Sequence, residues 1–220
     1  MRVVILDVGL GNLRSVERAL EAAARERALE ATVLRSAEPS VLASADRLVV
    51  PGQGGFRDGA RALAGDRARA LTTAIERGTP YLGICLGLQL LFEASSEAPG
   101  ERGLGVLRGR VERLVGGPGV KIPHMGWNQL EPRSGGHPLL DAAGGEGAWV
   151  MFAHSYHAVP AEPGLTRAVA RHGGQLVTAA IARDHLFATQ FHPEKSQRAG
   201  LALLGAFLGG APIPRRTGNP

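Results

Sequence analysis

The sequence predicts a single-domain α/β protein: a doubly wound, mostly parallel sheet with helices on both faces and a smaller antiparallel sheet from the second half. The first half alternates short apolar strands with helical segments, which is typical of parallel sheets. The second half carries several short strands with no helices between them. A length of 220 residues suits one such domain. We expect it to cover residues 1–209, followed by a loose tail rich in proline and arginine at 210–220.

The first half opens on a predicted strand at residues 2–7, whose continuous apolar run at 3–6 is typical of a strand that is buried on both faces. Asn12 can cap the helix that follows, because its side chain can accept a hydrogen bond from the first turn. In that helix, apolar residues recur at helical spacing. The other elements expected here are strands at 31–35, 48–50 and 81–84 and helices near Val41, at 60–77 and at 86–94.

The second half begins with an alternating strand at 106–115. The segment 124–128 (HMGWN) is dense in bulky and polar groups for a loop. It is interpreted as a contact surface, with a packed strand end as the alternative. Further strands are expected at 149–153, 166–170, 176–181 and 186–190, and a closing helix at 196–208.

The composition indicates which classes of partner and which cellular compartment to expect. The formal net charge is +5, but the basic residues are scattered and aromatic residues make up only 5% of the chain, which argues against a nucleic-acid surface. No apolar run approaches the roughly 18 residues of a membrane span, and the N-terminus lacks the pattern of a signal peptide. A lone cysteine excludes an internal disulfide. We therefore expect a cytoplasmic protein that binds neither nucleic acid nor membrane.

The strongest chemical signal is Cys85, which stands between a predicted strand and a predicted helix. Gly83 and Gly87 flank it in a Gly-x-Cys-x-Gly pattern, which has the form of a nucleophile elbow. The helix N-terminus favours a thiolate there. A lone cysteine is more often an ordinary buried residue, but its position and the two glycines favour a nucleophile.

His192 is the candidate base among seven histidines, because it directly follows an apolar strand whose carboxyl end should face the active site. Glu194, two residues on, can hydrogen-bond the imidazole and fix its tautomer, as the acid of a catalytic triad does. The tripeptide alone could equally be a surface turn. Together with Cys85 it predicts a Cys-His-Glu triad.

A glycine loop follows the strand that ends near Val50, and its backbone N–H groups could form an oxyanion hole. Gly52 and Gln53 would contribute from this loop and Leu86 from the elbow. A mobile turn is the alternative; a phosphate loop lacks its Gly-Lys-Ser/Thr continuation.

Two weaker patterns do not predict a binding site. The glycines at 9 and 11 follow a strand as in a dinucleotide loop, but Arg14 occupies the place of the third glycine. His154 and His157 lack a third ligand in the pattern for a metal. No metal and no cofactor are expected.

Three motifs together resemble the class I (triad) glutamine amidotransferase family. They are the segments 51–54 (PGQG), 83–89 (GICLGLQ) and 191–194 (FHPE). Four longer segments resemble the subfamily of glutaminase subunits of imidazole glycerol phosphate synthases. They are 7–16 (DVGLGNLRSV), 123–128 (PHMGWN), 154–156 (HSY) and 190–196 (QFHPEKS). The resemblance spans residues 2 to about 209.

The resemblance implies that Cys85 attacks the side-chain amide of glutamine, that His192 moves the proton and that Glu194 orients His192. It implies that ammonia passes to a (βα)₈-barrel cyclase, which forms a heterodimer with the chain and makes imidazole glycerol phosphate in histidine biosynthesis. The residues implied to bind glutamine are Gly52, Gly54, Gln89, Glu97, Ser155 and Tyr156. Those implied to contact the cyclase are Asn12, Met125, Trp127, Asn128 and Lys195.

Two positions depart from the usual family pattern: Val8 where tyrosine is frequent, and Gln53 where valine is common. The alternatives are a glutaminase subunit for anthranilate, carbamoyl phosphate or pyridoxal phosphate synthesis, a binding subunit without catalysis, and a stand-alone cysteine hydrolase of γ-glutamyl substrates. The segment 124–128 argues against the first, and the intact triad residues against the second. The third predicts full activity without a partner.

Overall fold

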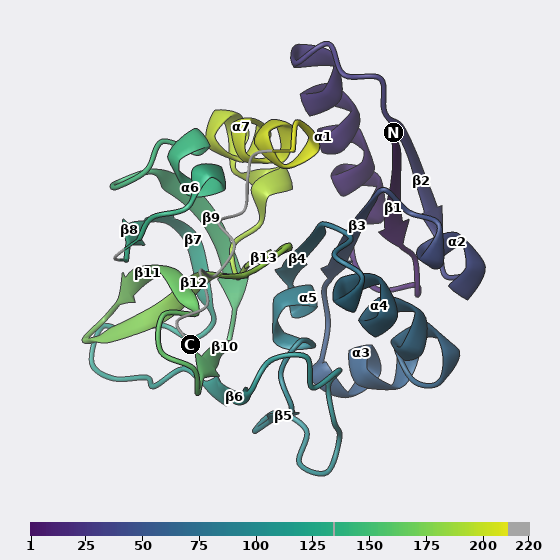
Figure 1. Cartoon of the computed structure of the whole chain (residues 1–220). Helices are drawn as coiled ribbons and strands as arrows, with labels where there is room; N and C mark the ends of the chain where they lie inside the picture. Colours follow the sequence, from purple (N-terminus) through teal and green to yellow (C-terminus); the bar gives the residue numbers. More distant parts are fainter. Residues whose placement is uncertain (134, 211–220) are drawn as a thin grey trace, which may run out of the picture.

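A computed structural model describes residues 1–133 and 135–210. Within these residues the centre is an eight-stranded sheet in the order β2-β1-β3-β4-β13-β12-β11-β8 (Figure 1). Its parallel part consists of β1 (Arg2–Leu6), β2 (Thr32–Ser36), β3 (Arg47–Gly52), β4 (Tyr81–Cys85) and β13 (Leu186–Thr189). Its antiparallel part consists of β12 (Gln175–Arg183), β11 (Thr166–His172) and β8 (Glu131–Pro132).

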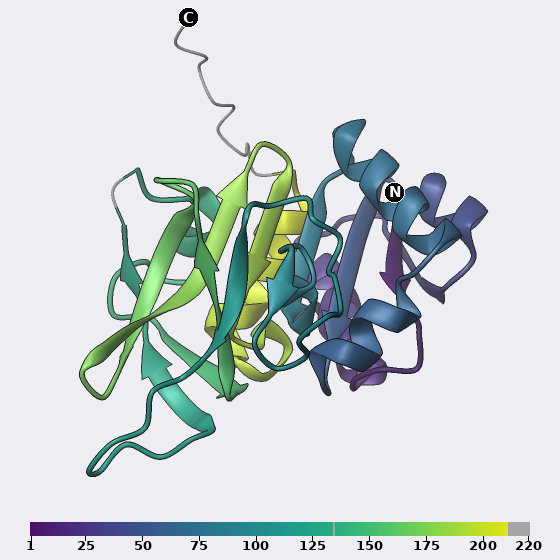
Figure 2. The same cartoon turned by 90° about the horizontal axis from the view of Figure 1, so that it is seen from below.

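Two smaller sheets complete the described strands, and the predicted fold class is confirmed. One sheet joins β10 (Tyr156–Pro160), β6 (Gly109–Arg113) and β5 (Ala94–Ser95), and the other pairs β7 (His124–Gln129) with β9 (Trp149–His154). The antiparallel pairing expected of the second half thus occurs partly as an extension of the main sheet. In Figure 2 the first half of the chain (purple to blue) lies on one side and the second-half strands (green) on the other.

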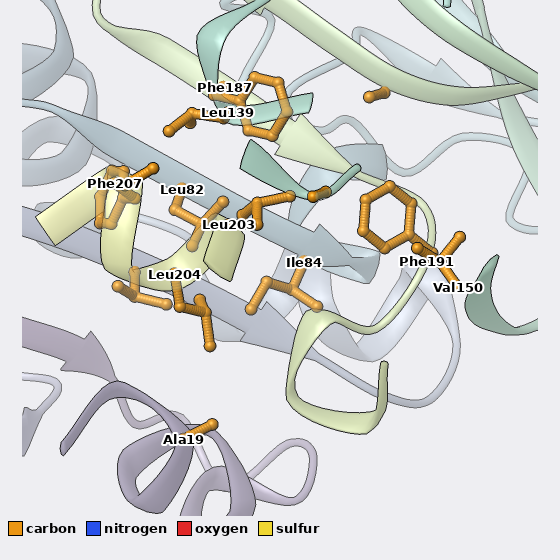
Figure 3. Packing of buried hydrophobic residues seen from close by; sticks show 14 of the residues in the cluster. Ala19, Leu82, Ile84, Leu139, Val150, Phe187, Phe191, Leu203, Leu204 and Phe207 are labelled. Atoms are coloured by element: carbon orange, nitrogen blue, oxygen red, sulfur yellow. The ribbon is translucent and has the colours of Figure 1, made fainter. Parts of the chain in front are cut away.

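Helices cover both faces of the main sheet. One face packs against α1 (Leu13–Glu26), α6 (Pro138–Ala142) and α7 (Gln197–Leu208), and the other against α2 (Pro39–Ala43), α3 (Phe56–Ala62), α4 (Asp66–Glu76) and α5 (Leu86–Gln89). Figure 3 shows Leu203 and Leu204 of α7 beside Leu82 and Ile84 of β4. Tyr81 belongs to the opposite cluster, so alternate residues of β4 anchor the strand in both layers.

Two predicted helices are wrong in extent. The helix expected at 60–77 is broken by Gly65, whose φ of +69° turns the chain between α3 and α4. The helix expected at 86–94 ends at Gln89. The next carbonyls bond to a distant loop instead: Leu104 N–H donates to Leu90 O at 2.7 Å, and Leu107 N–H to Leu91 O at 3.0 Å.

Segment 124–128 lies in a strand and not in the expected loop. The strand β7 pairs antiparallel with β9, with Trp127 opposite Met151. The strand expected at 106–115 is confined to β6, while β5, β8, β10 and α6 have no counterpart among the expected elements. The expected tail lies outside the described residues except for Gly210. No helix in the described ranges is long and apolar enough to cross a membrane.

Gly87→Ala is expected to lower the free energy of unfolding by about 3 kcal/mol or more. A β-carbon on Gly87 would lie 1.7 Å from the carbonyl oxygen of Val50, and neither backbone can yield without moving α5 off β3. Urea unfolding followed by circular dichroism would measure the change. Gly174→Ala is the matched control, because nothing lies within 4 Å of a β-carbon there. Equal midpoints for the two variants would contradict the packing argument.

Candidate active site

Cys85 ends β4 and is followed at once by α5, which is the local geometry of the predicted elbow. Its φ of +53° is strained for a residue with a side chain. The turn closes on glycine backbone: a β-carbon on Gly83 would lie 2.8 Å from Gly87 O. Only 7% of Cys85 is exposed. The glycine spacing therefore allows the sharp turn that holds the sulfur at the carboxyl edge of the sheet.

The sheet order brings His192 to Cys85. The strand β13 pairs parallel with β4, so the residues that follow the two strands meet at the same edge. His192 Nδ1 lies 2.8 Å from Glu194 Oε1, and both side chains are only 2% exposed. Glu194 is held in the short 3₁₀ turn Pro193–Lys195. Because Glu194 occupies Nδ1, Nε2 is the ring nitrogen that can exchange a proton with sulfur.

The surroundings favour a protonated His192. Burial lowers the pKa of its imidazole, but hydrogen bonds with Cys85 and Glu194 and the negative charge that both can carry raise the pKa to about 9. At neutral pH the ring therefore holds a proton that it can deliver to a leaving amine.

Cys85 and His192 line one pocket of about 370 Å³. Five of the six predicted glutamine-binding residues also line it: Gly54, Gln89, Glu97, Ser155 and Tyr156. The remaining lining residues are Gln53, Leu86, Pro123, Met125, Ala153 and His154. The sixth predicted residue, Gly52, stands beside Cys85 in the register of β3 and β4.

The loop after β3 is closely packed against the elbow. A β-carbon on Gly52 would lie 2.8 Å from Leu86 Cβ, so a side chain at this position would force the loop away. Glu97 secures the far end of the loop, because its Oε2 accepts a hydrogen bond of 2.9 Å from Phe56 N–H. Gly54 has a φ of +119°, which favours glycine. The loop's backbone is therefore packed directly beside the elbow.

Sequence reasoning missed Gln190, which is fully buried beside the nucleophile. Its Nε2 donates to Cys85 Sγ at 3.6 Å, and its Oε1 accepts from Gln89 Nε2 at 3.1 Å. A polar side chain directly after an apolar strand, two residues before the candidate base, was the available signal. His154, which the sequence analysis weighed as a metal ligand and placed in the segment 154–156, lines the pocket.

The predicted partner-contact residues fall into three places. Met125 and Trp127, 66% and 45% exposed, lie on the outer face of β7, and Met125 also lines the pocket. Asn128 bonds inward to Arg171 O. Asn12 caps α1, as predicted, by accepting from Ser15 N–H, and Lys195 ends the 3₁₀ turn that carries Glu194.

A larger hollow, of about 620 Å³, lies at the opposite edge of the sheet. It is lined by Gly78, which precedes β4, and by His185, which precedes β13, so it lies at the amino ends of the strands. Ligand sites of open α/β sheets lie at the carboxyl ends. Among the described residues no group of three or more His, Cys, Asp or Glu is arranged to hold a metal.

Comparison with known proteins agrees with this geometry. The family model "Glutamine amidotransferase class-I" matches residues 4–208. Imidazole glycerol phosphate synthase subunit HisH of Synechococcus elongatus is 48% identical over 209 residues, which cover 94% of this chain and 92% of that protein. The subunit of the same name from Rhodospirillum rubrum is 46% identical over 217 residues, covering 96% of this chain and all (100%) of that protein.

Solved structures show the same fold at lower identity. A structure of a glutamine amidotransferase superposes with a TM-score of 0.69 at 21% identity, covering 95% of this chain and 99% of that chain. The structure of PurLQS from Thermotoga maritima gives a TM-score of 0.70 at 21% identity, covering 94% and 97%.

Proposed function

This chain belongs to the class I glutamine amidotransferase family, and from that premise we propose that Cys85, His192 and Glu194 form its catalytic triad. The chain is a glutaminase subunit of imidazole glycerol phosphate synthase and serves histidine biosynthesis. The observation that supports the triad is that a strained Cys85 lines one pocket with a buried His192 whose Nδ1 is held by Glu194.

In the proposed reaction, Cys85 Sγ attacks the side-chain amide carbon of glutamine as a thiolate, its proton having passed to His192. The oxyanion that forms accepts hydrogen bonds from Leu86 N–H and from the Gly52–Gln53 peptide. His192 then gives its proton to the nitrogen, and the C–N bond breaks to release ammonia. Water adds to the thioester carbon while His192 takes one of its protons, and the C–S bond breaks to give glutamate.

The pocket suits the two ends of a glutamine molecule. The carboxylate of Glu97 supplies a negative charge for its ammonium group. Backbone at Ser155 and Tyr156 and the amide of Gln89 line the remaining wall. A pocket with one nucleophile, one carboxylate and several neutral polar groups fits a small zwitterion.

A partner explains the exposed apolar residues near the pocket. Met125 and Trp127 project from β7 next to the glutamine site. Exposed tryptophan and methionine are favoured in interfaces. We propose that this face docks the barrel cyclase in a heterodimer in the cytoplasm, and that ammonia passes across it.

The partner is also expected to switch on the glutaminase. Ammonia released without an acceptor is wasted, and a loop rich in glycine allows a peptide to rotate. We propose that the Gly52–Gln53 peptide turns its N–H into the oxyanion hole when the cyclase docks.

Ammonia release from glutamine, measured with and without the barrel cyclase and an analogue of its nucleotide substrate, tests the proposal. We expect a large stimulation by the complete complex. Equal rates with and without the cyclase would overturn the activation proposal and favour a stand-alone hydrolase. Stimulation by an anthranilate or pyridoxal phosphate synthase partner instead would overturn the assignment to this synthase.

Trp127→Ala is expected to weaken binding of the cyclase by about 2 kcal/mol, or roughly 30-fold in Kd, because exposed tryptophans often dominate an interface. Titration calorimetry with the cyclase would measure it. Val115→Ala removes another exposed apolar side chain, outside the β7–β9 face, and should leave Kd unchanged. An unaltered Kd for Trp127→Ala would place the docking face elsewhere.

A further inference from the structure

We propose that His154, His124 and Asn128 are positioning residues for the glutaminase reaction. They form a directional hydrogen-bond relay behind the pocket that holds the Tyr156 carbonyl and, through it, the amide of Gln89. The proposal rests on the function proposed above, since it assumes that this pocket binds glutamine.

The donor and the acceptor of each hydrogen bond can be assigned by starting from the Tyr156 carbonyl. Tyr156 O can only accept, so His154 Nδ1 carries the hydrogen that bridges the 2.8 Å between them. In a neutral ring, His154 Nε2 must then accept, and it does so from His124 Nδ1–H at 3.1 Å. His124 Nε2 accepts in turn from the Asn128 amide at 3.1 Å, which also donates to Arg171 O at 2.8 Å. All these contacts are satisfied in one arrangement of protons.

The surroundings keep both rings neutral and fixed in place. Burial lowers the pKa of His154 to about 3, although its bond to Tyr156 opposes this, and burial with neighbouring His172 lowers the pKa of His124 to about 4. The His124 ring stacks on Phe152 at 4.5 Å and on His172 at 4.3 Å between ring centroids. A second proton on either ring would place two N–H groups against each other, so the relay requires neutrality.

The relay continues from Tyr156 to the nucleophile. Gln89 Nε2 donates both to Tyr156 O at 3.0 Å and to Gln190 Oε1 at 3.1 Å, which uses both of its hydrogens. Gln190 Nε2 donates to Cys85 Sγ at 3.6 Å. The Tyr156 carbonyl thereby orients the Gln89 amide, and the Gln89 amide in turn orients the Gln190 amide. Losing the donor at His154 leaves Tyr156 O with Gln89 as its one partner, so the carbonyl and the amide bonded to it are held less firmly.

The outer end of the relay lies on the proposed docking strand. In β7, His124 and Asn128 point inward, while Met125 and Trp127 on the alternate positions point outward. Any shift of this strand on docking therefore reaches the glutamine pocket through His124. The strand thus serves both the interface and the site.

The test compares two variants of one residue in the complete complex with the cyclase. His154→Asn keeps a donor near the position of Nδ1, toward Tyr156 O, whereas His154→Gln places its amide near Nε2 and loses that donor. We expect KM for glutamine to rise about tenfold in His154→Gln and by no more than about threefold in His154→Asn. His137→Gln is the matched control, because His137 is buried outside the pocket.

A second readout separates positioning from general damage. Cys85 alkylation by a glutamine-like chloroketone should slow about tenfold in His154→Gln, while alkylation by iodoacetamide, which needs no glutamine site, should stay within about twofold. Equal KM values for the two His154 variants, an equal KM rise in His137→Gln, or parallel loss of both alkylation rates would overturn the relay. Absence of glutaminase in the wild-type complex would overturn the proposed function instead.

Discussion

Cys85→Ala is expected to reduce ammonia release from glutamine by roughly 10,000-fold or more, to the limit of detection. Without the sulfur no thioester can form, and His192 cannot compensate because water in the pocket is a far weaker nucleophile. The measurement is glutamate formation by the complex of this chain with the barrel cyclase, with ammonia counted in parallel.

The lone cysteine makes the control direct. Because Cys85 is the only cysteine of the chain, a glutamine-like chloroketone should add one label per wild-type chain and none to the variant. Titration calorimetry with the cyclase should give the wild-type Kd for Cys85→Ala, which would show that the subunits still assemble. Substantial glutaminase activity in the variant would disprove the nucleophile.

Glu194→Gln is expected to lower kcat by roughly 100- to 10,000-fold while changing KM little. The carboxylate holds His192 Nδ1 at 2.8 Å and stabilises the protonated ring, and both side chains are buried from water. A neutral amide at this position can present the wrong atom to the imidazole. Glu162→Gln is the matched control, since Glu162 pairs with Arg183 away from the pocket.

The pH profile gives this prediction a second readout. In the wild type the pKa of His192 is raised to about 9, so the ring keeps the proton needed by departing ammonia until the pH exceeds that value. Activity should therefore fall only above about pH 9. Loss of the Glu194 charge lowers the pKa of His192, so the decline should begin at a lower pH in Glu194→Gln. An unshifted alkaline limb would show that Glu194 does not act through the imidazole.

Much of the fold could be predicted because its signals are local. The run at 2–7, the helix capped by Asn12 and the strand before Cys85 depend on periodicity and capping within a few residues, and the structure confirms them. The extent of α5 could not be predicted in this way. The carbonyls that follow its last residue, those of Leu90 and Leu91, accept hydrogen bonds from residues 104 and 107, which local helix propensity does not register.

The sequence by itself determined the sharp turn at Cys85, because glycine at 83 and 87 is the residue that the close backbone contacts permit. It also determined the adjacency of His192 and Glu194, which are two residues apart. Only the tertiary structure decided which groups surround Cys85. Gln190, Tyr156 and His154 reach the site through strand order, across separations such as the 105 residues between Gln190 and Cys85. Turn geometry depends on neighbours in the chain, whereas a hydrogen-bond relay depends on which strands lie side by side.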